Sequence, residues 1–199
     1  MKESDFLSAF NQPWRVVRDA GEPFPNAKRP AAVLICLNPA GGELSVIFTQ
    51  RASHLKHHAG QISFPGGKAE THDTDLIATA FRETEEEIGL ATDAITVIGQ
   101  LPPYRTISGF AVTPIVAKHE HGFDVQRDLV LDKNEVESVF EVPLSFLMDE
   151  SNYFVQLVHR GQLSFPLNYV TYGDRVIWGA TAGMMAQLRD HIMFYLRNN

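Results

Sequence analysis

Three glutamates near the middle of the chain have the spacing of ligands on one face of a helix. Glu83, Glu86 and Glu87 stand at positions i, i+3 and i+4, so a helix brings them to the same side. Like charges at these spacings destabilise a helix by roughly 0.2–0.5 kcal/mol per pair. A divalent cation prefers carboxylate oxygens and would remove that repulsion. The spacing therefore indicates a metal site, with a solvated acidic face as the alternative reading.

The segment Leu76–Ile88 is the clearest predicted helix, and Gly89 is its expected C-cap. Its apolar side would face the core, while Arg82 can pair with Glu86 one turn later. The side chains expected in the core are those of Ile77, Ala80, Phe81, Thr84 and Ile88. An apolar side next to an acidic side predicts that the core fixes the direction in which the glutamates point.

A glycine pair, Gly66-Gly67, follows a short predicted strand and precedes a loop that contains Asp73. Two glycines allow a close approach of backbone to backbone, or of backbone to a ligand. The pair does not belong to a nucleotide P-loop, because Lys68 is followed by Ala69 and not by Ser or Thr.

Together these residues resemble the Nudix box, which is Gly, five residues, Glu, seven residues, then Arg-Glu-apolar-x-Glu-Glu-x-Gly-apolar. Here five residues separate Gly67 from Asp73, and eight more lead to "RETEEEIGL", which begins at Arg82. Three departures are an Asp in place of the first Glu, a gap that is one residue longer, and Thr84 at an aliphatic position. The departures concern the role of Asp73, whereas Thr84 can still pack its methyl group on the core.

The Nudix resemblance implies a Nudix fold, an α/β/α sandwich with a mixed β-sheet. The order of the predicted elements also favours the α+β class, because strands come mostly before and after one central helix. The resemblance further implies that Glu83, Glu86 and Glu87 bind Mg²⁺ or Mn²⁺. Arg82 would orient a neighbouring glutamate, and Glu135, in "NEVESVF", is the candidate for a further base or metal ligand from a loop.

The stretch "IFTQRASHLKHHAGQISFPGG" is similar to the signature of the coenzyme A pyrophosphatase branch of the family. Lys56 replaces an Arg of that signature; "SGFAVTPIVA", "NEVESVFEVPLSFL" and "WGATAGMM" are also similar to the branch. This resemblance implies hydrolysis of coenzyme A to 4'-phosphopantetheine and adenosine 3',5'-bisphosphate. The residues expected to bind the anionic substrate are Arg51, Lys56, Gly66, Gly67 and Lys68.

Other functions remain as alternatives. A Nudix hydrolase of ADP-ribose, NADH or another nucleoside diphosphate-linked compound would share the same box. A non-catalytic nucleotide-binding Nudix module would keep the fold without turnover. The histidines of "HLKHH", or His119 and His121, could instead bind zinc, but no cysteine lies nearby and their spacing is irregular.

Composition predicts one globular domain over residues 1–199, with an N-terminal arm at 1–29 and the box region at 66–90. Of its 199 residues 44% are hydrophobic and 21% charged, and the formal charge of −7 argues against broad nucleic-acid binding. A single cysteine, Cys36, is expected to be buried. No signal core or membrane span is visible, so a cytoplasmic location is expected.

The expected helices are 4–10, capped by Ser4, and Leu76–Ile88 and Gly179–Leu196. Ala31–Leu37 and Leu44–Thr49 are expected to pair as a hairpin, and residues 11–30 to form an irregular arm. Further strands are expected in "QISFPGG" and at Ile95–Leu101, Ala111–Lys118, Val136–Val142, Phe154–Val158 and Leu163–Leu167. The apolar residues of the arm suggest contact with a partner chain and a possible homodimer; they are Phe6, Leu7, Phe10 and Trp14.

Overall fold

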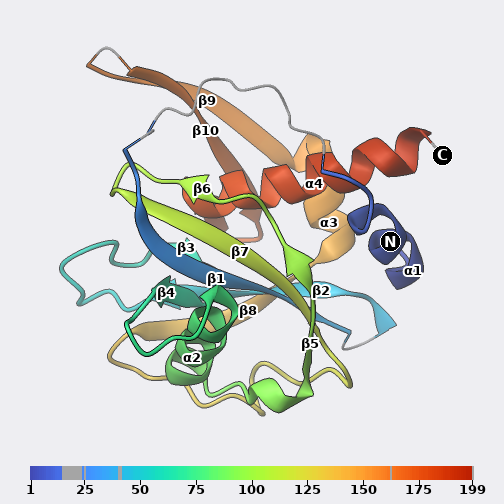
Figure 1. The fold of residues 1–199 in the computed structure, drawn as a ribbon, viewed down its shortest axis with the longest axis horizontal. Helices are drawn as coiled ribbons and strands as arrows, with labels where there is room; N and C mark the ends of the chain where they lie inside the picture. The colour runs from blue at the N-terminus through green and yellow to red at the C-terminus, as the bar shows by residue number, and fades with distance from the viewer. Residues whose placement is uncertain (15–23, 25, 40–41, 162, 199) are drawn as a thin grey trace.

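A mixed sheet with helices on both faces forms the centre of the molecule (Figure 1). The computed structural model describes residues 1–14, 24, 26–39, 42–161 and 163–198. Five strands follow the order β3-β2-β1-β7-β5, while β4 pairs with β1, β6 with β7 and β8 with β2. The β1–β7 pairing is parallel and the others are antiparallel. The strands are β1 (Arg29–Asn38), β2 (Ser45–Arg51), β3 (Ile62–Ser63), β4 (Gly66–Lys68), β5 (Ile95–Gln100), β6 (Tyr104–Arg105), β7 (Phe110–His119) and β8 (Val136–Pro143).

A second, three-stranded antiparallel sheet has the order β11-β10-β9. Its strands are β9 (Tyr153–Arg160), β10 (Leu163–Tyr172) and β11 (Arg175–Trp178). The helices are α1 (Glu3–Phe10), α2 (Leu76–Ile88), α3 (Leu144–Met148) and α4 (Ala180–Asn198), with short 3₁₀ turns at Thr92–Ala94 and Glu150–Asn152. Helix α2 covers one face of the main sheet, and α1, α3 and α4 lie on the other side (Figure 1).

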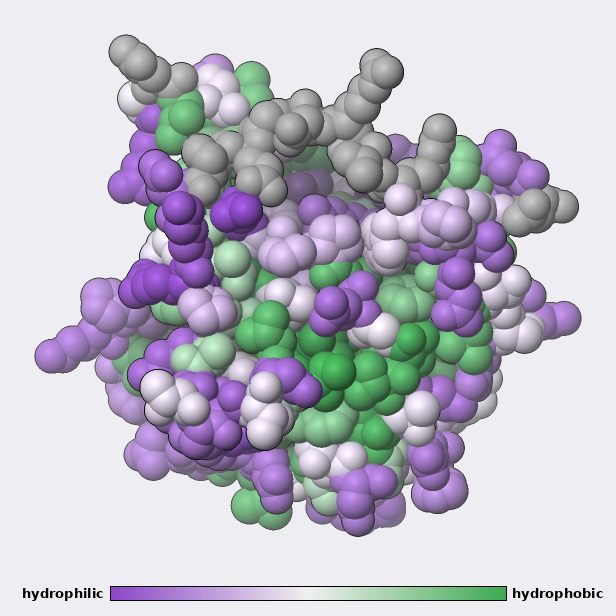
Figure 2. Space-filling view, viewed as in Figure 1, coloured by the Kyte–Doolittle hydropathy of each residue, from purple (hydrophilic) through white to green (hydrophobic). Residues whose placement is uncertain are grey.

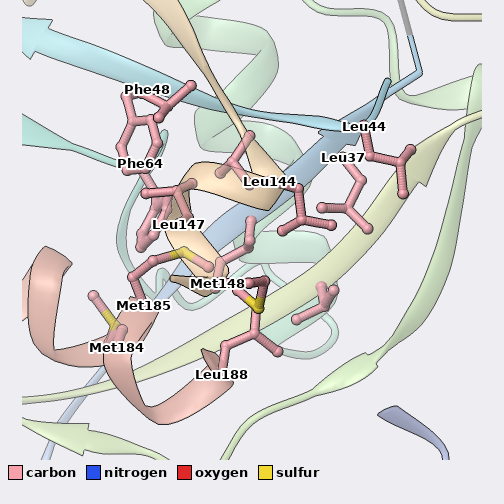
Figure 3. Close-up of a cluster of buried hydrophobic side chains, with 14 of the residues drawn as sticks. Leu37, Leu44, Phe48, Phe64, Leu144, Leu147, Met148, Met184, Met185 and Leu188 are labelled. Atoms are coloured by element: carbon pink, nitrogen blue, oxygen red, sulfur yellow. The ribbon is translucent and has the colours of Figure 1, made fainter. Parts of the chain in front are cut away.

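Strand β1 has helices on both sides, so its apolar run is buried apart from the half-buried Val33. Successive side chains of a strand point to opposite faces. Leu34 and Cys36 join the apolar cluster beside α2, and Ile35 and Leu37 join the cluster under α3 and α4. Figure 3 shows the second cluster, in which Met184, Met185 and Leu188 of α4 lie against side chains from α3 and the sheet. Burial raises the pKa of the Cys36 thiol to about 12, which confirms the predicted core thiol.

The described residues 1–14 of the N-terminal arm pack on their own chain, so the prediction of contact with a partner chain is wrong for Phe6 and Phe10. Phe6 and Phe10 are buried in the core, and Leu7 packs against it. The Trp14 ring stacks on the ring of His191 in α4, with centroids 3.8 Å apart. Helix α4 has apolar residues around much of its circumference, and α1 covers part of it. Of the predicted irregular stretch 11–30, residues 15–23 and 25 lie outside the described residues.

Most predicted elements are present. Helix α2 has the predicted bounds, and the β1–β2 hairpin is confirmed. The predicted Ser4 cap is wrong, because α1 begins at Glu3 after Lys2, and no side chain caps it. Strands β6 and β11 and helix α3 were not predicted, because two to five residues are too few to show a period. None of the described helices is both long and apolar enough to span a bilayer.

On the face of the molecule shown in Figure 2, hydrophobic residues gather near the middle. In the same view of the ribbon, β7 crosses this region (Figure 1). Hydrophilic residues surround that area. The β9–β10 hairpin extends away from the rest of the chain at the upper left of Figure 1.

Candidate active site

Helix α2 is fixed at both ends and along its apolar side. The Asp75 carboxylate accepts a hydrogen bond from the Ala78 amide at 2.8 Å and caps the first turn. Gly89 adopts the left-handed conformation with φ 65° and closes the last turn. In between, Thr84 is buried, and its hydroxyl donates to the Ala80 carbonyl at 2.7 Å. Thr84 therefore fits the core at a position where aliphatic residues are usual.

The glycine pair lies directly against the acidic helix. Gly66 has a φ of 148°, and a Cβ there would collide with the backbone of Ala32 and Val33. A Cβ on Gly67 would collide with the carboxylate of Glu83. The Gly66 amide also donates a hydrogen bond to the Glu87 carboxylate at 3.2 Å. Both glycines are thus required by contacts at the site.

Arg82 connects the loop after the glycine pair to the glutamates. Its Nε and Nη2 donate to the two carboxylate oxygens of Asp73 at 2.9 and 3.0 Å. Its Nη1 donates to Glu83 and to Glu86, both at 3.0 Å, and Nη2 also donates to the Lys68 carbonyl at 3.2 Å. This guanidinium holds the loop, the helix and two carboxylates in one network.

Asp73 is the anchor of that network. Its side chain is only 3% exposed and also accepts from the Thr79 hydroxyl at 2.8 Å and the Glu70 amide at 2.9 Å. The hydrogen bonds from Arg82 hold the pKa of Asp73 well below its usual range. Sequence reasoning left the role of Asp73 open and did not identify Thr79. No spacing rule connects these two residues, which meet because the loop turns back onto the helix.

Glu87 is a buried carboxylate. Its side chain is 5% exposed, and desolvation raises its pKa to about 8. The Gly66 amide and the guanidinium of Arg51, whose Nη1 lies 3.9 Å from Glu87 Oε1, offset part of that shift. Burial also raises the pKa of Glu83, against the opposing effect of Arg82. A carboxylate buried next to a second carboxylate is a position where a cation would be strongly stabilised.

The three glutamates do not form a ready metal cage. Within the described residues, no group of three or more His, Cys, Asp or Glu side chains is arranged to hold a metal ion. The Nη1 of Arg82 donates to the carboxylates of both Glu83 and Glu86. The Glu86 side chain is 61% exposed and lies 3.0 Å from Arg82 Nη1. The three side chains supply hard carboxylate oxygens, the ligands that divalent cations prefer.

The other predicted site residues lie on exposed segments around the glutamates of α2. Glu135 is exposed in the loop before β8, and its charge raises the pKa of both Glu83 and Glu87. Its carbonyl accepts from the Ala52 amide at 2.8 Å, which joins that loop to the segment after β2. Lys56 is exposed in the loop 52–60, and the exposed Lys68 amine lies 3.8 Å from Glu70. Arg51 is thus the predicted substrate-binding side chain that reaches the glutamates.

The sequence matches known proteins over most of its length. The family model described as the NUDIX domain matches residues 27–155. A protein of Yersinia enterocolitica, named uncharacterized Nudix hydrolase NudL, is 38% identical over 162 residues, which are 81% of this chain and 80% of that protein. A NudL protein of Yersinia pestis is 35% identical over 195 residues, or 95% and 94% of the two chains.

The similarity of this chain to solved structures is weaker than its similarity to these two relatives. The MutT protein from Methanosarcina mazei Go1 has a TM-score of 0.49 at 20% identity, covering 86% of this chain and 95% of that one. The assignment rests on the family model and on the two relatives, and the mixed sheet with α2 against it has the arrangement expected of the family. The chain belongs to the Nudix hydrolase family.

Proposed function

We propose that this Nudix hydrolase cleaves the diphosphate linkage of coenzyme A and its derivatives, releasing 4'-phosphopantetheine and adenosine 3',5'-bisphosphate. The observation that carries the proposal is the contact between Arg51 and Glu87, 3.9 Å apart. Arg51 belongs to the segment that resembles the coenzyme A pyrophosphatase signature, and Glu87 belongs to the acidic helix. This contact supports a single site in which a cationic side chain and the box carboxylates face the same diphosphate.

Nudix hydrolases generally use divalent metal ions. Mg²⁺ or Mn²⁺, held by Glu83, Glu86 and Glu87, would offset phosphate charge and lower the pKa of a bound water. The chain supplies the positions of these groups. Arg82 and Asp73 set the direction of Glu83, and Gly67 leaves space for its carboxylate. Arg51, Lys56 and Lys68 would bind phosphate oxygens.

Hydrolysis adds the elements of water across the diphosphate: one P–O bond forms to the water oxygen and the bridging P–O bond breaks. A general base is needed to take the proton of the water. Glu135 is our candidate, because its charge already acts on both Glu83 and Glu87. Positioning and charge neutralisation would supply most of the rate, since phosphoryl transfer needs little covalent help from the protein.

The test is an assay of coenzyme A with Mg²⁺ in ¹⁸O-labelled water, with both products identified by mass spectrometry. Wild-type protein should give the two named products, and the label shows which phosphorus is attacked. Glu86→Gln should lower kcat by about 10³-fold or more, as expected when charge stabilisation in a transition state is lost. Glu85→Gln is the matched control: it lies on the same turn, is exposed, and should keep near-normal turnover. Wild-type turnover by Glu86→Gln would reject the assigned role of Glu86.

The same assay, run with other diphosphate compounds, distinguishes two alternative functions. Faster cleavage of ADP-ribose or NADH than of coenzyme A, measured at equal Mg²⁺, would indicate a Nudix hydrolase with a different diphosphate substrate. Saturable binding of these compounds without any cleavage would indicate a nucleotide-binding module. Retention of all three box glutamates together with the Arg82–Asp73 pair supports the enzyme.

A further inference from the structure

The second sheet carries most of the exposed apolar side chains of the described chain. Nine large hydrophobic residues are strongly exposed in the part of the chain that the structure describes, and six of them lie on β9, β10 and β11. The six are Phe154, Val155, Leu157, Leu163, Val176 and Trp178. Exposed apolar residues scattered singly need no explanation, whereas a group on one element indicates an interaction surface.

Both faces of the outer part of this sheet are apolar. Tyr169 stands opposite both Phe154 and Trp178, and the ring centroids are 6.1 and 6.4 Å apart, so the three rings form one row across the strands. Val155 and Leu157 point to the opposite face, because side chains alternate along a strand. These two are 54% and 58% exposed because the hairpin extends beyond the body of the molecule (Figure 1).

The outer edge of β9 has no neighbouring strand in the described chain, because β9 ends the order β11-β10-β9. The strand is eight residues long and contains no proline, and its one formal charge is Arg160 at its end. Proteins normally protect such an edge with charges, proline or a bulge, because its free N–H and C=O groups pair readily with another strand.

The sequence of β9 favours pairing with a second copy of itself. In "FVQLV" two apolar residues stand on each side of Gln156. Antiparallel self-pairing centred on Gln156 puts Phe154 opposite the partner's Val158 on one face, and Val155 opposite the partner's Leu157 on the other. Apolar pairs then meet on both faces of the joined sheet.

Charge and area agree with a second copy as the partner. The whole chain carries −7, but residues 153–178 contain only Arg160, Asp174 and Arg175 as charged residues, so acidic repulsion between copies is smallest here. The exposed side chains near this edge, Phe154, Val155, Leu157 and Leu163, offer roughly 400 Å² per chain, about half of the roughly 800 Å² per partner in a standard interface. Val176 and Trp178 are left out of the sum, because β11 is the strand farthest from β9. The paired β9 backbones would add to this area. Phe165 is left out of the sum, because Phe24 already covers it, with ring centroids 5.1 Å apart.

We propose that the protein is a twofold-symmetric homodimer in which the β9 edges of two copies pair antiparallel about Gln156 and join the small sheets into one. A symmetric interface of this kind uses the same patch on both subunits. The proposal does not depend on the substrate, so the dimer and the coenzyme A activity can fail separately.

The first test is the solution mass by light scattering after size exclusion, which should be twice the 22.2 kDa of one chain. Leu157→Lys places two charges in the interface and should weaken the dimer by at least ~100-fold. Ile107→Lys is the matched control, since Ile107 is 50% exposed but lies outside the small sheet. A monomeric wild type at tens of micromolar, including one that binds lipid vesicles or another protein through this sheet, overturns the proposal.

The second test locates the axis. Gln156→Cys should form an intermolecular disulfide under mild oxidation, because an axial pair of strand residues has a Cα separation suited to a disulfide. The native Cys36 is buried and should not form an intermolecular disulfide. Gln187→Cys, exposed on α4, should remain uncrosslinked. Equal crosslinking of both variants, or a dimer that persists in Leu157→Lys, overturns the β9 interface.

Discussion

The carboxylate of Glu83 occupies the space that a side chain on Gly67 would need. These residues lie on different elements, strand β4 and helix α2, so their contact determines how closely the loop approaches the helix. It also explains the second glycine of "PGG": Gly66 is required by its backbone conformation and by β1, and Gly67 is required by the glutamate.

Gly67→Ala should therefore destabilise the protein by about 1–3 kcal/mol, the usual cost of overpacking. The backbone conformation of Gly67 adds no strain, because its φ is not in the left-handed region. Urea denaturation measures the effect, and a double-mutant cycle with Glu83→Ala separates its cause. The loss should shrink when the carboxylate is absent; an equal loss in both backgrounds would contradict the contact.

Asp73→Asn should make the metal-free protein less stable at neutral pH and less sensitive to acid. The folded pKa of Asp73 is depressed by Arg82, so its contribution is present above the unfolded pKa of 3.8 and is lost as the pH falls below it. Thermal unfolding of wild type and variant between pH 7 and pH 2 should show two curves that approach each other as the pH falls below 3.8. Asp75→Asn is the control, because asparagine caps a helix as well as aspartate does and should change little.

Glu87 should make the folding stability of the metal-free enzyme fall as the pH rises, whereas Asp73 makes it fall as the pH drops. Its folded pKa of about 8 lies above the unfolded value of 4.5, so folding favours the protonated form. The stability present below pH 4.5 is then lost as the pH rises through 8. In EDTA, Glu87→Gln should remove this loss, of the order of a few kcal/mol, and be more stable than wild type at pH 8.5.

Adding Mg²⁺ should make wild type more stable than Glu87→Gln at pH 8.5. The reason is that the metal binds the ionised carboxylate, so the affinity of the site for Mg²⁺ rises with pH. Wild type should gain more thermal stability from Mg²⁺ at pH 8.5 than at pH 6, whereas Glu87→Gln should gain little at either. Exposed Glu85 provides the control, since Glu85→Gln should follow wild type throughout. A wild type indifferent to both Mg²⁺ and pH would argue against Glu87 as a ligand.

Arg51→Gln should act on both substrate and metal. The Arg51 charge lowers the pKa of Glu87, so its removal should raise that pKa further. The pH range in which Glu87 is ionised and can bind Mg²⁺, and with it the activity, should then shift to higher pH. KM for the diphosphate substrate should also rise, by about tenfold for one lost charge-assisted contact. Steady-state kinetics from pH 6 to 9 measure both effects. Lys56→Gln, on the exposed loop, should raise KM without the pH shift; a shift of equal size there would contradict the direct contact of Arg51 with Glu87.

The sequence alone determined the local features of this protein. The bounds of α2, its glycine C-cap, its apolar side and the Arg82–Glu86 pair are consequences of periodicity and short-range rules. The buried Cys36 and the β1–β2 hairpin follow from a continuous apolar run and the turn after it. The box motif predicted the family, because so many spaced residues do not coincide by chance.

Only the tertiary structure decided how deeply each charge is buried and what it meets. Glu86 and Glu87 are neighbours in sequence, yet one side chain is 61% exposed and the other 5%, because the Gly66 turn packs over the second. The pairing of Asp73 with Arg82, and the packing of Trp14 on His191, join residues 9 and 177 positions apart. Periodicity reports which side of a helix a residue is on; the elements that cover that side come from long-range packing.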